Sequence, residues 1–422
     1  MRTRRMMVRL VVLAAAAGGV GCSSKGGAGG DDNGMGGGGK NDGDDTSDAG
    51  TPDAMPVELF EAAFQFSQDQ LRAMVMTVPH DAHPTATDDD GEWLTEDSPD
   101  WRSGFYTGSL WIMYEHTDDV FWKTAAEAQQ ADLEQEKTEQ EKNDTGFKVL
   151  SSFGRAFQLT NNDDYRQVVV TAANTYALGW DDDVGAVNTF HLDDFNGNPF
   201  GTIIDHVMNL EIMTWAASHG GSSTLRDKAI SHARKSLADH VRPDGSTYHV
   251  VVYDEDDGDV EWRGTRQGAD DETTWSRGQA WAVYGFTMMY RETQEMDFLE
   301  GARKTADWYI AHLPADFVPY WDFDRPNEER DSSAAAIAAS GLLELAHIET
   351  DAANATRYRD AAFATLASLA SSAYLAQGTG SKATLLHAVT SKPGNNEVDV
   401  SLIYGDYYFH EALLRLRAWF GP

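Results

Sequence analysis

Residues 201–218 read GTIIDHVMNLEIMTWAAS, and this stretch decides the fold. Its apolar residues fall on all sides of a helix, which predicts one helix over 202–218 that is buried all round. By contrast, 222–240 carries polar residues along one face, as a half-exposed helix does. Because segments of these two kinds follow one another from residue 57 onward, the sequence predicts a predominantly helical protein.

Twelve helical segments are predicted, and buried and half-exposed segments alternate. This alternation predicts six helical hairpins closed into a ring, in which the buried helices form an inner barrel and the others cover it. The segments are 57–76, 104–116, 118–140, 145–159, 162–178, 202–218, 222–240, 274–293, 297–313, 331–348, 352–375 and 403–419. No linker-like composition interrupts 57–422, so this range is predicted to be one domain. One β-hairpin is predicted over 244–262, with its turn at Asp257-Gly258.

The first 56 residues differ from the rest in composition. Residues 1–9 hold four arginines, and the apolar run 10–20 ends just before Cys22, which is typical of a secretory signal. We interpret Cys22 as a lipoprotein acylation site, so 1–22 is the signal with its acylated cysteine; an ordinary cleaved signal is the alternative. Residues 23–56 are rich in Gly and Asp and predict a disordered tether. The protein is therefore predicted to be exported and anchored by lipid to a bacterial membrane, in the periplasm or on the cell surface.

The chain is strongly acidic, since its 422 residues include 33 Lys and Arg against 68 Asp and Glu, for a formal charge of -35. Such a charge repels nucleic acids and anionic membrane surfaces, so we expect no nucleic-acid partner and membrane contact only through the lipid anchor. Cys22 is the only cysteine, which excludes an intramolecular disulfide and a thiolate zinc cluster. No pair of histidines has the spacing of a metal site on one helix face. We therefore expect neither a metal nor another cofactor.

Two aspartates are placed where burial makes a charge costly. Asp205 lies inside the predicted buried helix, where a carboxylate without a cationic partner has a raised pKa, as a general acid near neutral pH needs. Asn209 is four residues further on, shares the predicted helix face and is expected to orient Asp205. Asp144 precedes an apolar helical pattern, and taken alone it fits a helix N-cap better than a catalytic group.

A polar and aromatic cluster over 266–281 reads RQGADDETTWSRGQAW. Gln267, Trp275 and Arg277 offer an amide, an aromatic plane and a fork of donors, which together are typical of a sugar site. Core packing is the alternative for Trp275 and the preferred interpretation for Trp281. Twelve tryptophans and fifteen tyrosines in an acidic exported protein also favour carbohydrate as the ligand.

The histidines are weaker candidates. His249 lies in the predicted hairpin, and a single histidine in such a place is more often structural than catalytic. The same interpretation applies to His191, His206 and His387.

Five short motifs follow one another along the chain. They are WRSGFYTGSLW (101–111), DTGF (144–147), IID with MNL (203–205 and 208–210), YH (248–249) and QGADDETTWSRGQAW (267–281). Together they resemble the motifs of the unsaturated glucuronyl hydrolases, glycoside hydrolase family 88. The resemblance runs in register over about the whole of 57–422 and ends in YGDYYF at 404–409. It implies an (α/α)6 barrel, in agreement with the ring inferred from the helix pattern.

The resemblance implies a hydrolase that acts on the chain ends left by polysaccharide lyases, where a non-reducing uronic acid carries a C4=C5 double bond. It implies that Asp205 is the general acid/base and that Asp144 is the second catalytic carboxylate. The residues that it implies around the unsaturated sugar are Trp101, His249, Gln267, Trp275 and Arg277. In the implied reaction an acid protonates C4, water adds at C5, and the resulting hemiketal opens and expels the remaining saccharide.

The chain departs from the family pattern at two positions next to these motifs. Asn143 stands where the family often has His or Asp, and Glu211 where it often has Pro. Three alternatives stay open: an unsaturated rhamnogalacturonyl hydrolase, an inverting glycosidase with Asp205 as acid and Asp144 as base, and a lipoprotein that binds oligosaccharide without turnover. A carboxylate inside an apolar helix argues against the last, because binding alone does not require it.

Overall fold

The computed structural model describes residues 57–140, 144–189 and 200–421. The predicted signal and tether, with Cys22, lie outside the described residues, as do Asn143 and His191. Each of the twelve predicted segments contains helix in the described part of the chain. None of the described helices is long and apolar enough to cross a lipid bilayer.

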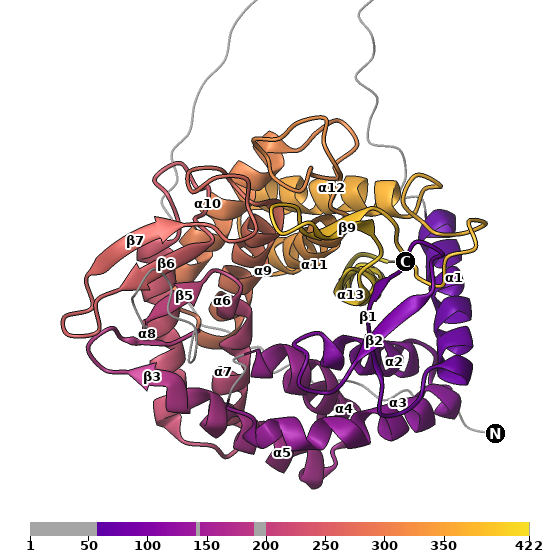
Figure 1. Ribbon diagram of the computed structural model, residues 1–422, viewed down its shortest axis with the longest axis horizontal. Helices are drawn as coiled ribbons and strands as arrows, with labels where there is room; N and C mark the ends of the chain where they lie inside the picture. Colours follow the sequence, from indigo (N-terminus) through magenta and orange to yellow (C-terminus); the bar gives the residue numbers. More distant parts are fainter. Residues whose placement is uncertain (1–56, 141–143, 190–199, 422) are drawn as a thin grey trace, which may run out of the picture. The chain divides into compact units, whose positions relative to one another are not determined.

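An inner ring is formed by largely buried helices. Its members are α2 (Ser103–Thr117), η2 (Gly146–Gly154) continued by α4 (Arg155–Thr160), α6 (His206–Asn209) followed by α7 (Glu211–Ser218), α9 (Ser276–Thr293), α11 (Ser332–Ile348) and α13 (Ile403–Phe420). Neighbouring members contact one another, and α13 closes the ring against α2 (Figure 1).

The remaining long helices cover this ring from outside and each bury one face. They are α1 (Val57–Thr77), α3 (Val120–Leu133), α5 (Asp163–Tyr176), α8 (Ser223–Asp239), α10 (Met296–His312) and α12 (Ala352–Leu369). In α5, for example, the buried residues Val168, Val169, Ala172 and Ala173 recur at helical spacing. Each outer helix precedes an inner one in the sequence, so the predicted (α/α)6 barrel of six helical hairpins is confirmed. Two short turns, η1 (Glu134–Thr138) and η3 (Ala177–Gly179), extend α3 and α5.

The hairpin predicted over 244–262 is present as β6 (Val250–Tyr253) and β7 (Val260–Gly264). Gly258 in its turn has φ +72°, a conformation that glycine adopts without strain. A third strand, β5 (Gly201–Ile203), pairs with β6 and was not predicted. Three further two-stranded sheets are also beyond the prediction of a single hairpin: β1 (His83–Thr87) with β2 (Trp93–Glu96), β3 (Trp180–Asp181) with β4 (Ala186–Val187), and β8 (Ala388–Ser391) with β9 (Asn396–Val400).

The single helix predicted over 202–218 is wrong at its start. Residues 201–203 are a strand, Asp205 lies just before α6, and α6 and α7 are separated at Leu210. The β-branched residues Thr202 and Ile203 pair with Val251 and Val250 of β6 instead of forming a first helical turn. A short apolar run fits a buried strand as well as a buried helix, so periodicity alone does not distinguish the two.

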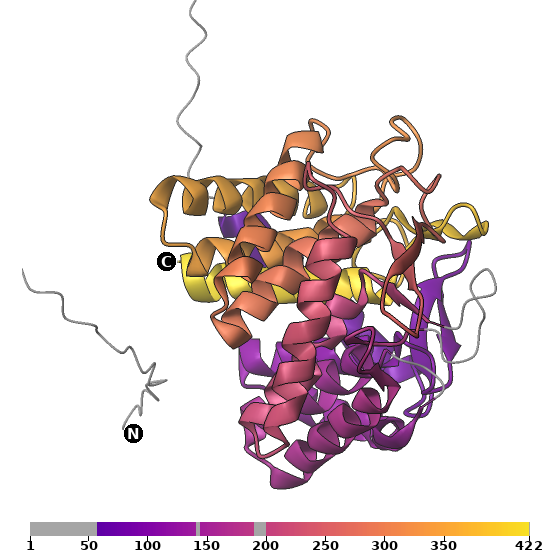
Figure 2. The same ribbon diagram turned by 90° about the vertical axis from the view of Figure 1, so that its left-hand side faces the viewer.

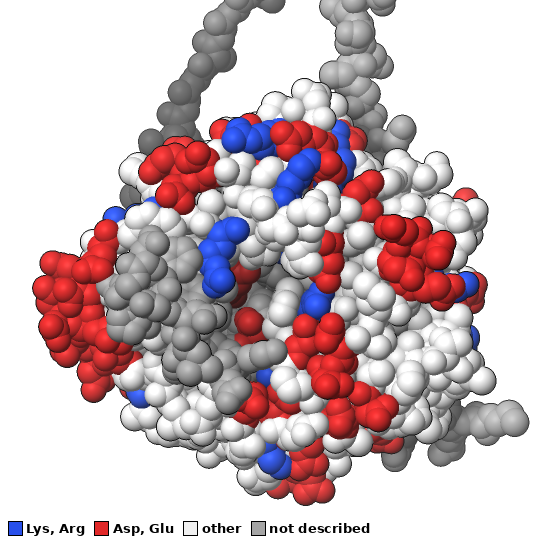
Figure 3. All heavy atoms as spheres, in the orientation of Figure 1, with Lys and Arg blue, Asp and Glu red and all other residues white. Residues whose placement is uncertain are grey.

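The strands and the longer loops gather at the end of the ring where the inner helices begin (Figure 2). Strand β1 contacts α2 and α13, and β8 contacts α11. On the face drawn in Figure 3, acidic side chains gather over the turn between β6 and β7. This turn contains Asp254, Glu255, Asp256, Asp257 and Asp259.

Candidate active site

One edge of the three-stranded sheet brings three predicted site residues together. Asp205 follows β5, His249 immediately precedes β6, and Gln267 follows β7 by three residues. Strand β6 runs antiparallel to both neighbours, and Ile203 at the end of β5 lies opposite Val250 at the start of β6. The end of β5, the start of β6 and the end of β7 therefore meet at the same edge.

Asp205 stands at the N-terminus of α6, and its side chain is 14% exposed. Burial raises the pKa of Asp205 to about 7; the charge of Arg277 opposes this shift, and that of Asp144 adds to it. Its Oδ2 atom has no hydrogen-bond partner among the described residues. A carboxyl group with this pKa can both give and take a proton near neutral pH.

His249 faces this carboxylate, with Nε2 3.7 Å from Oδ2 of Asp205. Its Nδ1 lies 3.3 Å from the backbone nitrogen of Arg266 and 3.4 Å from that of Gln267. Because a backbone N–H only donates, Nδ1 accepts and the ring proton of the neutral form is assigned to Nε2. Burial lowers the pKa of His249 well below its ordinary value, so the ring is neutral and presents an N–H to the site.

Asp144 is held by an amide from the neighbouring inner helix. Nδ2 of Asn209 donates to Oδ1 of Asp144 at 3.1 Å, and Oδ1 of Asn209 accepts the backbone N–H of Phe147 at 3.1 Å. Gly146 permits this approach, since a Cβ there would lie 2.9 Å from Cα of Asn209. Asn209 therefore orients Asp144, and not Asp205 as predicted, because Asp205 precedes the helix and the i, i+4 relation does not apply.

His206, which was predicted to be structural, adds to the polar surroundings of Asp144. Its Nε2 is 3.8 Å from Oδ1 of Asp144. Its Nδ1 lies 3.3 Å from the hydroxyl of Tyr176 and 3.2 Å from that of Thr189.

Arg277 is buried and has protein partners on two sides. Its Nη1 lies 3.1 Å from Oδ2 of Asp331 and also donates to the carbonyl of Val389, and Nη2 donates to the carbonyl of Thr390 at 2.7 Å. The guanidinium carbon is 4.4 Å from the centre of the Trp275 ring. The guanidinium of Arg277, which was predicted from the sequence as a sugar ligand, thus attaches β8 to the barrel.

The two tryptophans predicted to contact sugar differ in exposure. Trp275 is 3% exposed, and His249 stacks on it with the ring centroids 4.4 Å apart. Trp101 is half-buried and packs against Tyr404 at 4.9 Å and Phe147 at 5.6 Å. Trp101 therefore keeps surface for a ligand, whereas Trp275 supports His249.

Sequence reasoning missed two partners of the predicted residues. The carbonyl of Thr390 accepts one hydrogen bond from Nε2 of Gln267, at 2.8 Å, and another from the guanidinium of Arg277. Asp331 pairs with Arg277 and caps α11, where it accepts the backbone N–H of Ser333. Asp331 precedes a helix that starts with small residues, so its role as a helix cap is visible in the sequence. Its pairing with Arg277, and the contacts of the Thr390 carbonyl, join distant parts of the chain and are not visible from any local pattern.

The six-hairpin barrel, with two carboxylates and a half-buried tryptophan at the end where its inner helices begin, defines a barrel enzyme of the glycoside hydrolase class. The chain matches no family model. An unsaturated glucuronyl hydrolase of Formosa agariphila is 41% identical to it over 327 residues, which are 75% of this chain and 80% of the relative. The chain belongs to the unsaturated glucuronyl hydrolase family.

Solved structures agree with this membership. The crystal structure of an unsaturated glucuronyl hydrolase specific for heparin has a TM-score of 0.82 and 34% identity, over 86% of this chain and 97% of the other. A mutant of the Streptococcus agalactiae enzyme complexed with dGlcA-GalNAc6S has a TM-score of 0.72 and 27% identity, over 85% of this chain and 91% of the other.

Proposed function

We propose that this chain removes the non-reducing-end 4,5-unsaturated uronic acid from oligosaccharides released by polysaccharide lyases. The observation that carries the proposal is Asp205, a buried carboxyl group whose pKa is raised to about 7 beside the neutral ring of His249. Membership of the family and the ligand of the Streptococcus agalactiae relative support the same substrate class.

Protonated Asp205 donates its proton to C4 of the double bond in this mechanism, and positive charge develops at C5 and the ring oxygen. The Asp144 carboxylate, held by Asn209, stabilises that charge. Water adds at C5 and returns a proton to Asp205, so one carboxyl group serves both proton steps. The C5–O5 bond then breaks to leave a ketone at C5, and the hemiacetal at C1 releases the remaining saccharide as an alcohol.

The predicted binding residues have distinct tasks in this scheme. Trp101 stacks on the sugar, and the Nε2–H of His249 with the amide of Gln267 donates hydrogen bonds to it. Trp275 and Arg277 keep His249 and strand β8 in place through their own contacts.

A panel of lyase-generated disaccharides tests the proposal, with loss of the double-bond absorbance as the measurement. We expect absorbance to fall as the saturated sugar is released, and we expect the matching saturated glucuronides to stay intact. Cleavage of the saturated glycosides alone would identify an ordinary inverting glycosidase, and binding without turnover would identify a saccharide-binding protein.

The rate should decline as pH rises through about 7, because the first step needs Asp205 protonated. Below this pH the protonated form of Asp205 predominates, and kcat/KM is expected to reach a plateau. Stopped assays across the neutral range, with circular dichroism at each pH to verify the fold, measure the effect. A rate that stays flat far into the alkaline range would contradict the role of Asp205.

Asn209→Ala is expected to lower kcat/KM by about 10- to 100-fold, because a hydrogen bond to a charged group contributes roughly 1.5–3 kcal/mol. The alanine removes the amide that fixes Asp144 and leaves Asp205 in place. Asn174→Ala, on the outer helix α5, is the matched control, since the Asn174 side chain bonds only a carbonyl of its own helix in the described structure. Equal rates for the two variants would exclude the positioning of Asp144 by Asn209.

We also propose that the protein is exported and lipid-anchored through Cys22, on the basis of the arginine-rich, apolar and small-residue pattern of 1–22. Cys22→Ser is expected to release the protein from membranes in a host that processes lipoproteins, because serine offers no thiol for acylation. Membrane fractionation with activity assays measures this release. A variant that stays with the membrane would show that the anchor lies elsewhere.

A further inference from the structure

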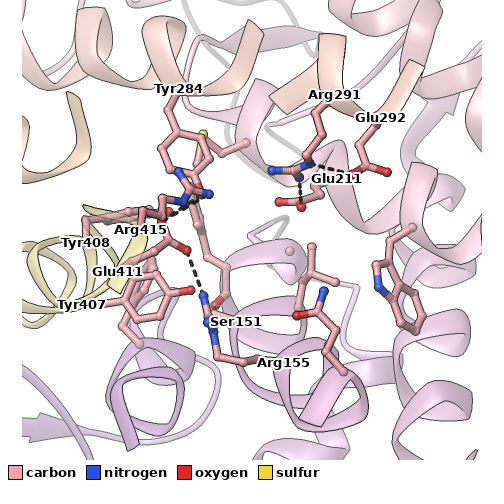
Figure 4. A pocket seen from close by; sticks show the side chains of 18 residues that line it. Ser151, Arg155, Glu211, Tyr284, Arg291, Glu292, Tyr407, Tyr408, Glu411 and Arg415 are labelled. Carbon is pink, nitrogen blue, oxygen red and sulfur yellow. Dashed lines mark hydrogen bonds and ion pairs between the residues drawn. The ribbon is translucent and has the colours of Figure 1, made fainter. Parts of the chain in front are cut away.

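A cavity lies inside the ring, beyond the active site along the inner helices. Its volume is about 310 Å³, and its walls come mainly from η2 and α4, from α6 and α7, and from α9 and α13 beyond their first turns (Figure 4). Trp101, Asp144 and Asp205 stand instead just before the first turns of α2, η2 and α6. Phe105 and Phe147 line the cavity and also contact Trp101, so the two sites share an aromatic partition.

The cavity wall carries three guanidinium groups and three carboxylates. They belong to Arg155, Arg291, Arg415, Glu211, Glu292 and Glu411. Each guanidinium is paired with a carboxylate of this wall: Arg291 contacts both Glu211 and Glu292, and Arg155 and Arg415 contact Glu411 (Figure 4).

Two further carboxylates contact the arginines of the wall without lining the cavity themselves. Glu344 contacts Arg291 at 2.6 Å and Arg415 at 2.9 Å, and Glu115 contacts Arg155 at 2.9 Å. These six wall groups and their two neighbours thus contain more carboxylates than guanidiniums. A cavity without a surplus of positive charge does not suit an anionic ligand such as a uronic acid.

The pKa of Glu211 reflects its burial and this excess of carboxylates over guanidinium groups. Burial raises the pKa of Glu211 to about 7; Arg291 opposes the shift, and Glu292 and Glu344 add to it. A further negative charge in the cavity would act against the same field. Glu211 is also one of the two positions at which the sequence departs from the family pattern.

A polar wall of this kind is not needed to close the barrel. Apolar side chains of similar volume would fill the space at no greater free energy, because ion pairs lose hydration when they are buried. The cavity also presents apolar surface from Leu150, Met208 and Trp215, together with the amide of Gln158, which is exposed to solvent. Donors, acceptors and apolar surface thus surround one space.

We propose that this cavity is a second binding site, for an uncharged, hydroxyl-rich ligand of the size of a mono- or disaccharide. Its volume is at the lower end of the range of roughly 300–1,000 Å³ for small-molecule sites and far above the space that one water needs. Guanidinium groups donate to hydroxyl oxygens, carboxylates accept from hydroxyl hydrogens, and the apolar surface meets the carbon faces of a sugar ring. The shared aromatic partition separates this site from Asp205, so we expect hydrolysis to proceed without a ligand in the cavity.

Saturation-transfer NMR on the full chain tests the proposal, with cellobiose and N-acetylglucosamine as neutral probes and glucuronate as the anionic probe. Gln158→Trp should abolish the neutral-sugar signal by covering the cavity, and Glu292→Gln should weaken binding by about tenfold through loss of one charged acceptor. Gln167→Trp is the matched control, because it places the same bulk on an exposed position of α5 outside the cavity.

We expect the neutral sugars to bind the parent and the control, glucuronate to bind more weakly, and all variants to hydrolyse the unsaturated disaccharide at the parent rate. A neutral-sugar signal that persists in both Gln158→Trp and Glu292→Gln would place binding elsewhere and overturn the proposal. Absence of any signal in the parent would identify a solvent-filled void. Loss of hydrolysis in Gln158→Trp, with a normal Gln167→Trp, would make the cavity part of the catalytic site.

Discussion

Asp205→Asn is expected to lower kcat/KM by about 10²- to 10⁴-fold, which is the usual contribution of a general acid/base. The amide keeps the shape of the side chain and removes the transferable proton. Both the protonation of C4 and the recovery of the proton from water depend on this one group, so no other step compensates. Hydrolysis of an unsaturated disaccharide, followed by absorbance, measures the loss.

The same substitution should stabilise the fold above neutral pH. Below pH 3.8 the carboxyl group is protonated in both the folded and the unfolded chain, so its ionisation contributes nothing to stability. Between 3.8 and about 7 the unfolded chain ionises first, so the folded parent progressively loses stability, by at most about 4 kcal/mol. Asp205→Asn lacks this loss, so its advantage in melting temperature should grow from about pH 4 to about pH 7 and then level off.

Asp256→Asn provides the matched control for both measurements, because Asp256 is exposed in the turn of the hairpin that carries His249. This variant should behave like the parent in rate and in melting temperature. Activity of Asp205→Asn within a few-fold of the parent would exclude Asp205 as the acid, whatever its effect on stability. A melting temperature that falls in Asp205→Asn would show that the carboxylate is satisfied in the fold.

Arg277→Ala is expected to lower the free energy of unfolding by about 3–5 kcal/mol, because it leaves the carboxylate of Asp331 buried without its cation. It also releases the carbonyls of Val389 and Thr390, so strand β8 loses its attachment to the barrel. Arg277→Lys should keep the charge and lose the planar fork, and it should therefore lie between the parent and the alanine variant. Urea unfolding measures the three proteins.

Combining the change with Asp331→Asn separates charge from packing. The double variant should be less destabilised than the sum of the single variants, since it removes the buried carboxylate along with its partner. Lys137→Ala, which breaks the exposed pair with Glu134, serves as a control and should change stability by less than about 1 kcal/mol. A similarly small effect of Arg277→Ala would show that Asp331 is not stabilised by the guanidinium.

The barrel was predictable from the sequence because its signal is repeated in every hairpin. Inner segments such as 331–348 are apolar on all sides and outer segments such as 352–375 on one, and the structure buries them accordingly. Strand β5 was not predictable, because its three residues belong to an apolar run whose period fits either strand or helix. The meeting of Asp205 and His249 at one sheet edge depends on that strand.

The site was predictable as a set of residues but not as a set of contacts. The candidate acid was found from the cost of burying a carboxylate, and the pKa of Asp205 follows that argument. The partners of Arg277 lie 54 and 112 residues away in the sequence, so no local spacing identifies them. Asn209 was assigned to Asp205 through a helical relation that the strand and turn before α6 remove.

The hairpin of β8 and β9 is fastened to the catalytic end of the barrel through main-chain carbonyls as well as through the ion pair of Glu397 with Arg102. Gln267 and Arg277 both bond the carbonyl of Thr390, and that contact is the same whatever side chain occupies the position. A change of side chain at Thr390 therefore leaves these two bonds in place, whereas Glu397 of β9 is tied to the barrel by its ion pair with Arg102. A grafted hairpin would keep the two bonds to its main-chain carbonyl whatever its sequence, but it would need a carboxylate at position 397 to retain the partner of Arg102.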